Sequence, residues 1–419
     1  MFVGITNTPR DYAWGSPSAI AELLGRAPSG KPEAELWLGA HPLAPSRIVQ
    51  PELVGGHADL AAWIAADPSR TLGERRTSDT LPFLLKILAA DQPLSIQAHP
   101  SPEQAREGFA RENDAGVPVH ADSRLYKDDR HKPELALALS ATFEALAGFR
   151  DVSFTRLLIA ELVALARGSG EDGDVAALQG FDELLTGPGD AALRRAVDFA
   201  LGGSAAAAAL IEVVCRLAER GLNATSYGRE LETIAELGRR HPGDPGILVA
   251  LLLNRVSLAQ GQALYLPSGN IHAYLRGLAV EIMAASDNVL RGGITSKHVD
   301  REELQRVVLF EPVPAPLLRA EEFGPGVEVF RPDVPDFQLA RVTVGASGAR
   351  HGYRLTGEES AILPLSGPSI AICLEGAAEI VGRTSATSLG RGESVYVTPD
   401  EEELTFTGSA VLFVAGPNA

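Results

Sequence analysis

Hydrophobic and polar positions divide the chain into segments of different periodicity. Residues 1–150 and 256–318 carry short apolar runs broken by turn residues, which is typical of β-strands. Residues 151–255 instead place apolar side chains at helical spacing in about five segments, with no strand signal between them. From 319 to 419 short strand patterns return, separated by glycine turns. We therefore expect a mainly β protein that carries an all-helical insertion.

One strand–turn–strand segment places a histidine at a strand start. Residues 263–266 are apolar, and Pro-Ser-Gly-Asn at 267–270 is a dense turn signal. Residues 271–274 then continue as the next strand, so the segment is expected to form a hairpin. In a β-barrel, a side chain at this position can point into the mouth of the barrel. His272 is therefore a candidate ligand or catalytic group.

Two further segments supply polar side chains at strand ends. Residues 94–99 alternate, so Ser95, Gln97 and His99 are expected to share one face of a strand. Residues 126–133 are densely charged and run directly into an apolar strand, which places Glu134 where a loop enters a buried region. A buried carboxylate needs a cation or hydrogen-bond donors.

Gln97, His99, Glu134 and His272 together suit a borderline divalent cation. Two imidazoles, one carboxylate and one amide oxygen are ligands that Zn²⁺ accepts. The two cysteines, Cys215 and Cys373, lie far from these residues in apolar segments, so a cysteine-type zinc site is excluded. We predict one Zn²⁺ per chain.

Composition narrows the class of partner. The net charge of −17 disfavours nucleic acid, but a small anion remains possible where basic groups converge. No apolar run reaches the ~18 residues of a membrane span, and no signal peptide is visible. Free thiols fit a reducing compartment. We expect a cytoplasmic monomer that acts on a small molecule and binds neither nucleic acid nor membrane.

Lysine is scarce in this chain. Only five of the 37 basic residues are lysine. An ammonium and a guanidinium are not interchangeable, so the retained lysines are candidates for sites that need a compact or titratable amine. Four of them lie beside the polar clusters, although each alone could be incidental: Lys86, Lys127, Lys132 and Lys297. Lys86 interrupts an apolar strand, so it lies either on an exposed face or in a cavity.

Several long motifs resemble type I mannose-6-phosphate isomerases (phosphomannose isomerases) of the cupin superfamily. The matching stretches are YAWGS (12–16), ELWLGAHP (35–42), PLSIQAHP (93–100), YKDDRHKPELALAL (126–139), LPSGNIHAY (266–274) and MAASDNVLRGGITSKHVD (283–300). The glycine-proline-histidine spacing at 261–272 is that of the second cupin motif. This chain departs from the family pattern at Pro102, where a lysine is common.

The resemblance implies a domain plan. Two cupin-type jelly-roll barrels and an all-α domain are expected. The catalytic barrel would comprise residues 1–150 and 256–318, the helical insertion residues 151–255, and the second barrel residues 319–419. Residues 392–399 echo 261–267 without a histidine, so the second barrel should lack a metal site.

The resemblance also implies an activity. It points to zinc-dependent interconversion of D-mannose 6-phosphate and D-fructose 6-phosphate, with Gln97, His99, Glu134 and His272 as zinc ligands. In the family, Arg291 is the active-site arginine.

The remaining roles follow from the chemistry. Proton transfer through a cis-enediol needs a base, stabilisation of the enediolate and a phosphate anchor. Glu281 and Asp287 both remain candidates for the base, with His131 and Lys132 as proton shuttles. Arg291 and Lys297 lie on one Gly-Gly segment that could hold an anion. The substrate could further contact Trp14, Lys86 and Ser95.

Two other functions remain to be distinguished. A non-catalytic double cupin could bind sugar or metal without turnover. A cupin dioxygenase would use iron in an open histidine-rich site, which a glutamine ligand fits poorly. The set of Lys132, Glu281, Asp287, Arg291 and Lys297 exceeds what binding requires, so an enzyme is favoured.

Overall fold

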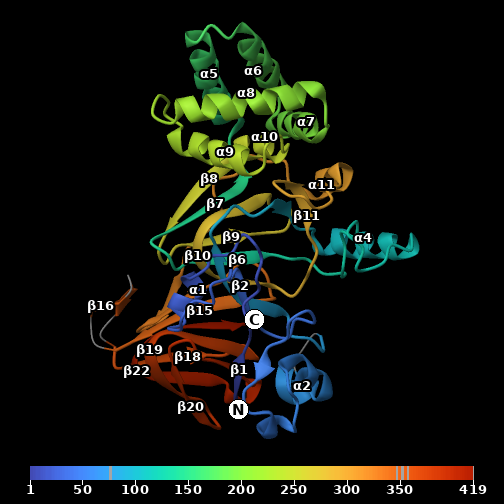
Figure 1. Ribbon diagram of the computed structural model, residues 1–419. Helices are drawn as coiled ribbons and strands as arrows, with labels where there is room; N and C mark the ends of the chain where they lie inside the picture. Colours follow the sequence, from blue (N-terminus) through green and yellow to red (C-terminus); the bar gives the residue numbers. More distant parts are fainter. Residues whose placement is uncertain (75–77, 346–347, 351–352, 356–357, 419) are drawn as a thin grey trace.

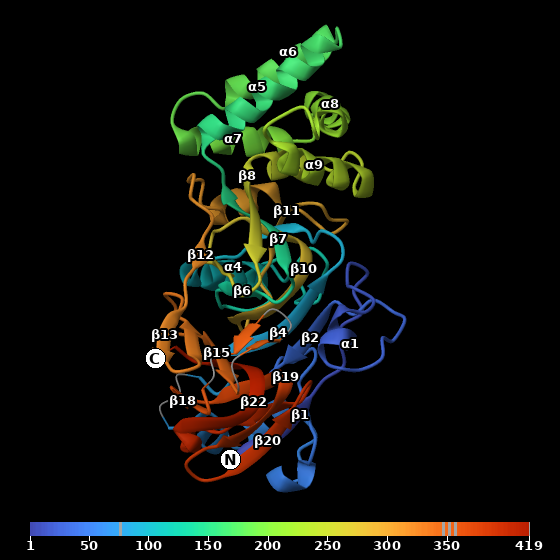
Figure 2. The same cartoon turned by 90° about the vertical axis from the view of Figure 1, so that its left-hand side faces the viewer.

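The computed structural model describes residues 1–74, 78–345, 348–350, 353–355 and 358–418. Its elements stack in three tiers, with the helical unit at one end, a sheet in the middle and a second sheet at the other end (Figures 1 and 2). Both sheets have ten strands, and a separate two-stranded sheet joins β16 (Gly348–Arg350) to β17 (Tyr353–Leu355).

The helical tier packs around one continuous apolar core. Its helices are α5 (Val152–Gly168), α6 (Asp172–Leu184), α7 (Gly189–Leu201), α8 (Ala205–Gly221), α9 (Gly228–Arg240) and α10 (Gly246–Leu251). The sequence pattern misses α6, because glycine and acidic residues at its start resemble a loop. The fifth expected helix was also too long: it ends at Leu251, and residues 253–259 form a strand that pairs with β7.

Among the described residues, no single helix combines the length and apolar composition of a membrane span. Taken together, α7 and α8 have the length and composition of a membrane span, but the pair bends by 96° at the break between the two helices.

The middle sheet is built around the long strand β10. Its strands are β2 (Glu35–Leu38), β4 (Phe83–Ala90), β5 (Ile96–Ala98), β6 (Glu134–Ala138), β7 (Thr142–Phe149), β8 (Leu253–Ala259), β9 (Ala263–Leu266), β10 (His272–Ala284), β11 (Leu290–Gly293) and β12 (Leu317–Leu318). The expected hairpin of β9 and β10 is wrong, because β6 lies between them and pairs with both. A turn signal fixes the local reversal of the chain, but which strands pair depends on contacts distant in sequence.

Alternation along the strands gives the middle sheet two buried faces. Leu88 and Ala136 belong to an inner cluster enclosed by this sheet, whereas their neighbours Ile87 and Leu137 belong to a cluster shared with the second sheet. Because both faces are covered, β4 and β6 are apolar at nearly every position. The polar side chains that do enter the inner face are therefore costly to bury unless they are paired.

The second sheet is formed mainly by the C-terminal part of the chain. Its strands are β1 (Phe2–Thr6), β3 (Arg47–Ile48), β13 (Glu321–Gly324), β14 (Val327–Phe330), β15 (Gln338–Val344), β18 (Ser360–Pro364), β19 (Ser369–Val381), β20 (Ala386–Gly390), β21 (Ser394–Val397) and β22 (Glu403–Gly416). The structure differs here from the division expected by chain order. β1 pairs with β21 and β3 with β1, so part of residues 1–150 completes the C-terminal sheet. β1 covers the edge that β21 would otherwise expose.

Short helices fill the connections between tiers. They are α1 (Ala19–Leu23), α2 (Leu60–Ala66), α3 (Pro68–Leu72), α4 (Pro102–Asp114), α11 (Arg301–Val307) and the 3₁₀ turns at Pro51–Val54 and Pro399–Glu401. α4 begins with a capping box in which Ser101 and Gln104 satisfy each other's backbone amides. It follows β5 directly, so it fixes the exit of the strand that carries Gln97.

Candidate active site

Three buried side chains converge at one end of the middle sheet. The Nε2 atoms of His99 and His272 lie 3.3 Å from opposite carboxylate oxygens of Glu134. One potential ligand atom from each residue lies within 4.8 Å of the other two. All three side chains are at most 2% exposed. The sequence had proposed these residues together from three separate segments, and the fold brings them to one point.

The outer nitrogens of the two imidazoles are fixed by backbone carbonyls. Nδ1 of His99 donates to the carbonyl of Asn288 at 2.7 Å, and Nδ1 of His272 donates to that of Asn270 at 3.0 Å. Each Nε2 is therefore the unprotonated atom, and neither has a hydrogen-bond partner among the described residues. Burial lowers the pKa of His99 to about 4. Buried imidazole nitrogens that face a carboxylate and have no hydrogen-bond partner fit a divalent cation.

Gln97 lies beside the triangle through strand pairing. β5 places it directly opposite His272 on one side and Arg291 on the other. Residues opposite each other in an antiparallel pair point to the same face. Gln97 and Arg291 are thus both directed to the side of the sheet that holds His272.

Lys132 completes the surroundings of Glu134. Its ammonium donates to Oε1 of Glu134 at 2.6 Å. Burial alone would raise the pKa of this carboxyl, but the ammonium of Lys132 holds it well below its usual range. Glu134 is therefore ionised, as a metal ligand must be. Tyr274, which sequence reasoning missed, directs its hydroxyl toward the other oxygen at 3.5 Å.

Three charged side chains, Glu35, Lys86 and Glu281, lie next to one another on the neighbouring strands β2, β4 and β10. Strand register aligns Trp37 with Lys86 and Lys86 with Glu281. Lys86 lies 2.9 Å from Glu281 and 3.4 Å from Glu35, and all three residues are buried. Lys86 is therefore buried rather than on an exposed strand face, and its ammonium is an ion-pair partner of Glu281.

Glu35 is a member of this row that the sequence did not single out. Its second oxygen accepts a hydrogen bond from Trp37 Nε1 at 2.9 Å. The alternation of Glu35 and Trp37 on one strand face was the available signal. Burial raises the pKa of Glu281, although Lys86 opposes this.

Asp287 is paired with His41, which the sequence analysis did not include among the site residues. His41 Nε2 lies 3.3 Å from its Oδ2, and His41 Nδ1 accepts the amide of Leu43. Burial would raise the pKa of Asp287, but His41 lowers it below the usual value. The neighbouring Asn288 is fully buried and binds the backbone of the charged loop at Asp128 and Arg130.

Arg291 and Lys297 form the cationic edge of the site. Burial lowers the pKa of Arg291, and burial together with Arg291 lowers that of Lys297. In the described part of the chain, neither side chain makes a hydrogen bond or an ion pair. Two neighbouring cations without a protein partner are suited to a bound anion.

The remaining candidates lie at the margin. Nε2 of His131 lies 2.8 Å from Oδ2 of Asp336, which belongs to the loop between β14 and β15 of the second sheet. This ring nitrogen is therefore already engaged by a protein partner. Trp14 stacks on Tyr12 and packs against the inner cluster. Ser95 is half-buried ahead of β5, and no hydrogen bond of its side chain is recorded among the described residues.

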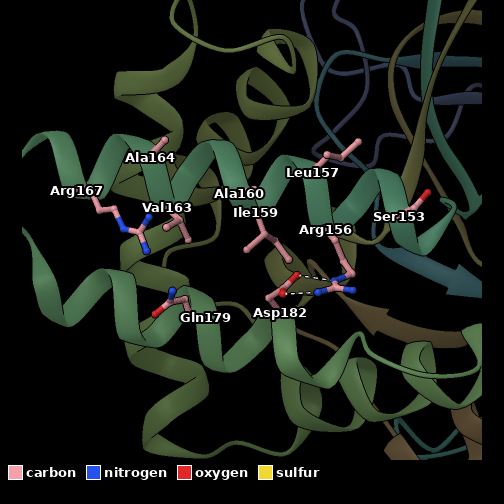
Figure 3. A pocket seen from close by; sticks show the side chains of 10 residues that line it. All are labelled: Ser153, Arg156, Leu157, Ile159, Ala160, Val163, Ala164, Arg167, Gln179 and Asp182. Atoms are coloured by element: carbon pink, nitrogen blue, oxygen red, sulfur yellow. Dashed lines mark hydrogen bonds and ion pairs between the residues drawn. The ribbon is translucent and has the colours of Figure 1, made fainter.

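A hollow between α5 and α6 offers a contrast (Figure 3). It has a volume of about 610 Å³ and lies on the helical unit. Figure 3 shows an ion pair of Arg156 with Asp182 in a lining that is half apolar and half polar. Its lining residues include no cluster of buried ionisable side chains, so we assign the candidate active site to the middle sheet.

The chain is similar to known proteins along nearly its whole length. Residues 2–152 match the family described as phosphomannose isomerase type I, catalytic domain. The mannose-6-phosphate isomerase of Escherichia coli (strain K12) is 36% identical over 422 residues, covering 97% of each chain.

Solved structures match over the full length. A mannose 6-phosphate isomerase structure described as holo and zinc-bound has a TM-score of 0.83 and 33% identity, and it covers 100% of both chains. The apo form from Salmonella typhimurium has a TM-score of 0.82 and 32% identity, covering 100% of this chain and 99% of the other. From the identity along nearly its whole length, the chain belongs to the mannose-6-phosphate isomerase family of aldose–ketose isomerases.

Proposed function

We propose that this chain interconverts D-mannose 6-phosphate and D-fructose 6-phosphate through a cis-enediol, with one Zn²⁺ per chain. One observation carries the proposal: the buried triangle of His99, Glu134 and His272 lies on the same face of the sheet as the unpartnered guanidinium of Arg291. A metal position next to an anion position matches a substrate with a polyol end and a phosphate end.

His99, Glu134 and His272 would hold the metal, with Gln97 as the fourth ligand. When bound, zinc supplies Lewis-acid stabilisation to oxygens of the substrate. Lys132, bound to Glu134, balances the charge of this ligand and stands close enough to the site to exchange a proton with a substrate oxygen. His131 would pass a proton outward through its contact with Asp336.

Glu281 is the better of the two candidates for the base. Its pKa is raised by burial, whereas His41 lowers that of Asp287. A carboxylate with a raised pKa accepts a carbon-bound proton more readily at neutral pH. In this proposal Glu281 carries the proton between C2 and C1 on one face of the enediol, and Lys86 holds the carboxylate in place.

Arg291 and Lys297 would bind the phosphate. Neither side chain has a hydrogen-bond or ion-pair partner among the described residues, so both can donate to phosphate oxygens. Trp14 and Ser95 would border the path of the sugar, and no phosphate contact is assigned to Pro102.

We further infer that the two ten-stranded sheets are cupin-type jelly rolls. In this division residues 151–255 are an insertion into the catalytic barrel, and residues 319–419 with β1 and β3 form a second barrel without a metal site. We also propose that the chain acts as a monomer in the cytoplasm, where its free cysteines, Cys215 and Cys373, would stay reduced.

A coupled assay with mannose 6-phosphate, mannose and a chelator tests the proposal. Turnover should require the phosphate, stop after complete metal removal and return with Zn²⁺. A non-catalytic binding protein would retain zinc without turnover. Equal rates on mannose and mannose 6-phosphate would exclude the phosphate anchor, and undiminished activity without metal would exclude the metal role.

A further inference from the structure

One carboxylate of the helical tier holds the backbone of the loop that leads from Arg291 to Lys297. Oδ1 of Asp244 accepts the amide of Ile294 at 2.8 Å, and Oδ2 accepts that of Thr295 at 3.2 Å. The same Oδ1 accepts the amide of Gly246 at 2.7 Å. Asp244 therefore joins the start of α10 to the end of β11.

The backbones on either side of this carboxylate approach too closely for side chains. A Cβ added at Gly246 would lie 2.8 Å from the Cα of Gly293, and one added at Gly293 would lie 2.4 Å from the Cα of Gly246. The two glycines thus allow the helical tier and the loop to touch backbone to backbone. This contact brings the amides of the loop within reach of Asp244.

The loop is held in a conformation that it would not adopt unaided. Ile294 has φ of 54°, a left-handed backbone that is unfavourable for a β-branched residue. Its side chain is 3% exposed and packs in the core shared with Ile247 and Leu248 of α10. Strain of this kind persists where the surroundings over-determine the backbone. Here the two hydrogen bonds to Asp244 and the burial of Ile294 do so.

The loop held by Asp244 connects the two residues of the cationic edge, Arg291 and Lys297. Arg291 is fixed before the bend by pairing with Gln97, whereas Lys297 lies after it. The amide of Lys297 is bound by the hydroxyl of Thr295, whose own amide is bound by Asp244. We infer that Asp244 is a positioning residue through which the helical insertion holds Lys297 beside Arg291 for the phosphate of the substrate. This inference rests on the phosphate role proposed above for the same two residues.

Asp244→Ala and Asp244→Asn provide the test. The alanine variant loses all three acceptor contacts, whereas asparagine keeps the shape and one acceptor oxygen. We expect the KM for mannose 6-phosphate and the inhibition constant of inorganic phosphate to rise by about tenfold or more for alanine, and by less for asparagine. kcat and the zinc content should change little, because the metal ligands and Arg291 stay in place.

Two further variants separate positioning from general loss of stability. Gly246→Ala keeps the carboxylate but pushes on Gly293, and it should raise the same two constants. Asp59→Ala removes a matched carboxylate that caps α2 far from the site, and Gly180→Ala fills open space on α6. Both controls should leave KM and phosphate inhibition unchanged.

The outcomes distinguish this inference from the proposed function. If the wild-type protein does not turn over mannose 6-phosphate, the proposed function fails. If the wild type is active and folded Asp244→Asn and Gly246→Ala variants retain its KM and phosphate inhibition, the positioning role is overturned. A fall in kcat with unchanged phosphate inhibition would also overturn it.

Discussion

The buried ammonium of Lys86 gives the sharpest test of how this site is held. Lys86 lies between Glu281 and Glu35 on the floor of the inner cluster. Replacing it by methionine retains much of the volume but leaves two carboxylates without a cation. We expect the variant Lys86→Met to be strongly destabilised and inactive.

The magnitude follows from the two separations. At an effective dielectric constant of about 20, unit charges 2.9 and 3.4 Å apart attract by roughly 6 and 5 kcal/mol. Desolvation of the ammonium offsets several kcal/mol of this attraction. Removing one partner of a buried pair costs about 3–5 kcal/mol, because the charge left behind is uncompensated. We therefore expect a loss of about 3–5 kcal/mol at neutral pH for Lys86→Met.

The double variant Lys86→Met/Glu281→Gln is the matched control. It removes both charges of the shorter pair, and Glu35 keeps its hydrogen bond from Trp37. The double variant should be more stable than Lys86→Met alone, with a coupling energy of at least about 1.5 kcal/mol. It should remain inactive, because it also lacks the proposed base.

The loss should also depend on pH. Burial raises the pKa of Glu281, and removal of Lys86 takes away the charge that opposes this rise. A carboxyl with a raised folded-state pKa weakens the fold above that pKa. The penalty in Lys86→Met should therefore shrink as the pH falls toward 4.5, the ordinary value for a glutamate.

Urea unfolding followed by tryptophan fluorescence measures these differences, since Trp37 lies against Lys86. Equal stability of the single and double variants at neutral pH would refute the reasoning. A loss below about 1 kcal/mol in Lys86→Met would do so as well, because it would place the pair in the range of exposed salt bridges.

Three other outcomes follow from the site. His272→Ala should lose bound zinc and activity together while the fold persists, which metal analysis and circular dichroism can check; retained zinc would contradict its role as a ligand. Arg291→Ala should keep its zinc but lose at least about a hundredfold in kcat/KM, whereas a near-wild-type rate would remove Arg291 from the mechanism. Asp336→Asn should lower kcat without changing zinc content, because it weakens the contact that holds the proposed proton shuttle His131; an unchanged kcat would exclude the Asp336–His131 contact from catalysis.

Local sequence patterns predicted much of the site. The alternation at 94–99, the charged loop before Glu134 and the turn before His272 each marked a polar side chain at a strand end. The structure brings ligand atoms of three of these residues, His99, Glu134 and His272, within 4.8 Å of one another. Such positions can be recognised in the sequence because nearby residues determine where strands end and where turns form.

Helical content was predicted well where apolar spacing was regular and poorly where it was not. The sequence pattern missed α6 because its first turn consists of glycine and aspartate. It extended the preceding helix into β8 because the apolar pattern continues from the helix into the strand. A short apolar run does not by itself distinguish a buried strand from a buried helix. The pairing of β8 with β7 decides it.

The pairing of strands that are distant in the chain could not be predicted from the sequence. The separation of β9 from β10 by β6, the joining of β1 to the C-terminal sheet and the partners of Lys86 all depend on contacts between residues far apart in the chain. The sequence by itself determined which residue types stand at strand ends and which segments have the regular apolar spacing of a helix. Only the tertiary structure decided which charges face each other, because strand register and long-range packing set those distances.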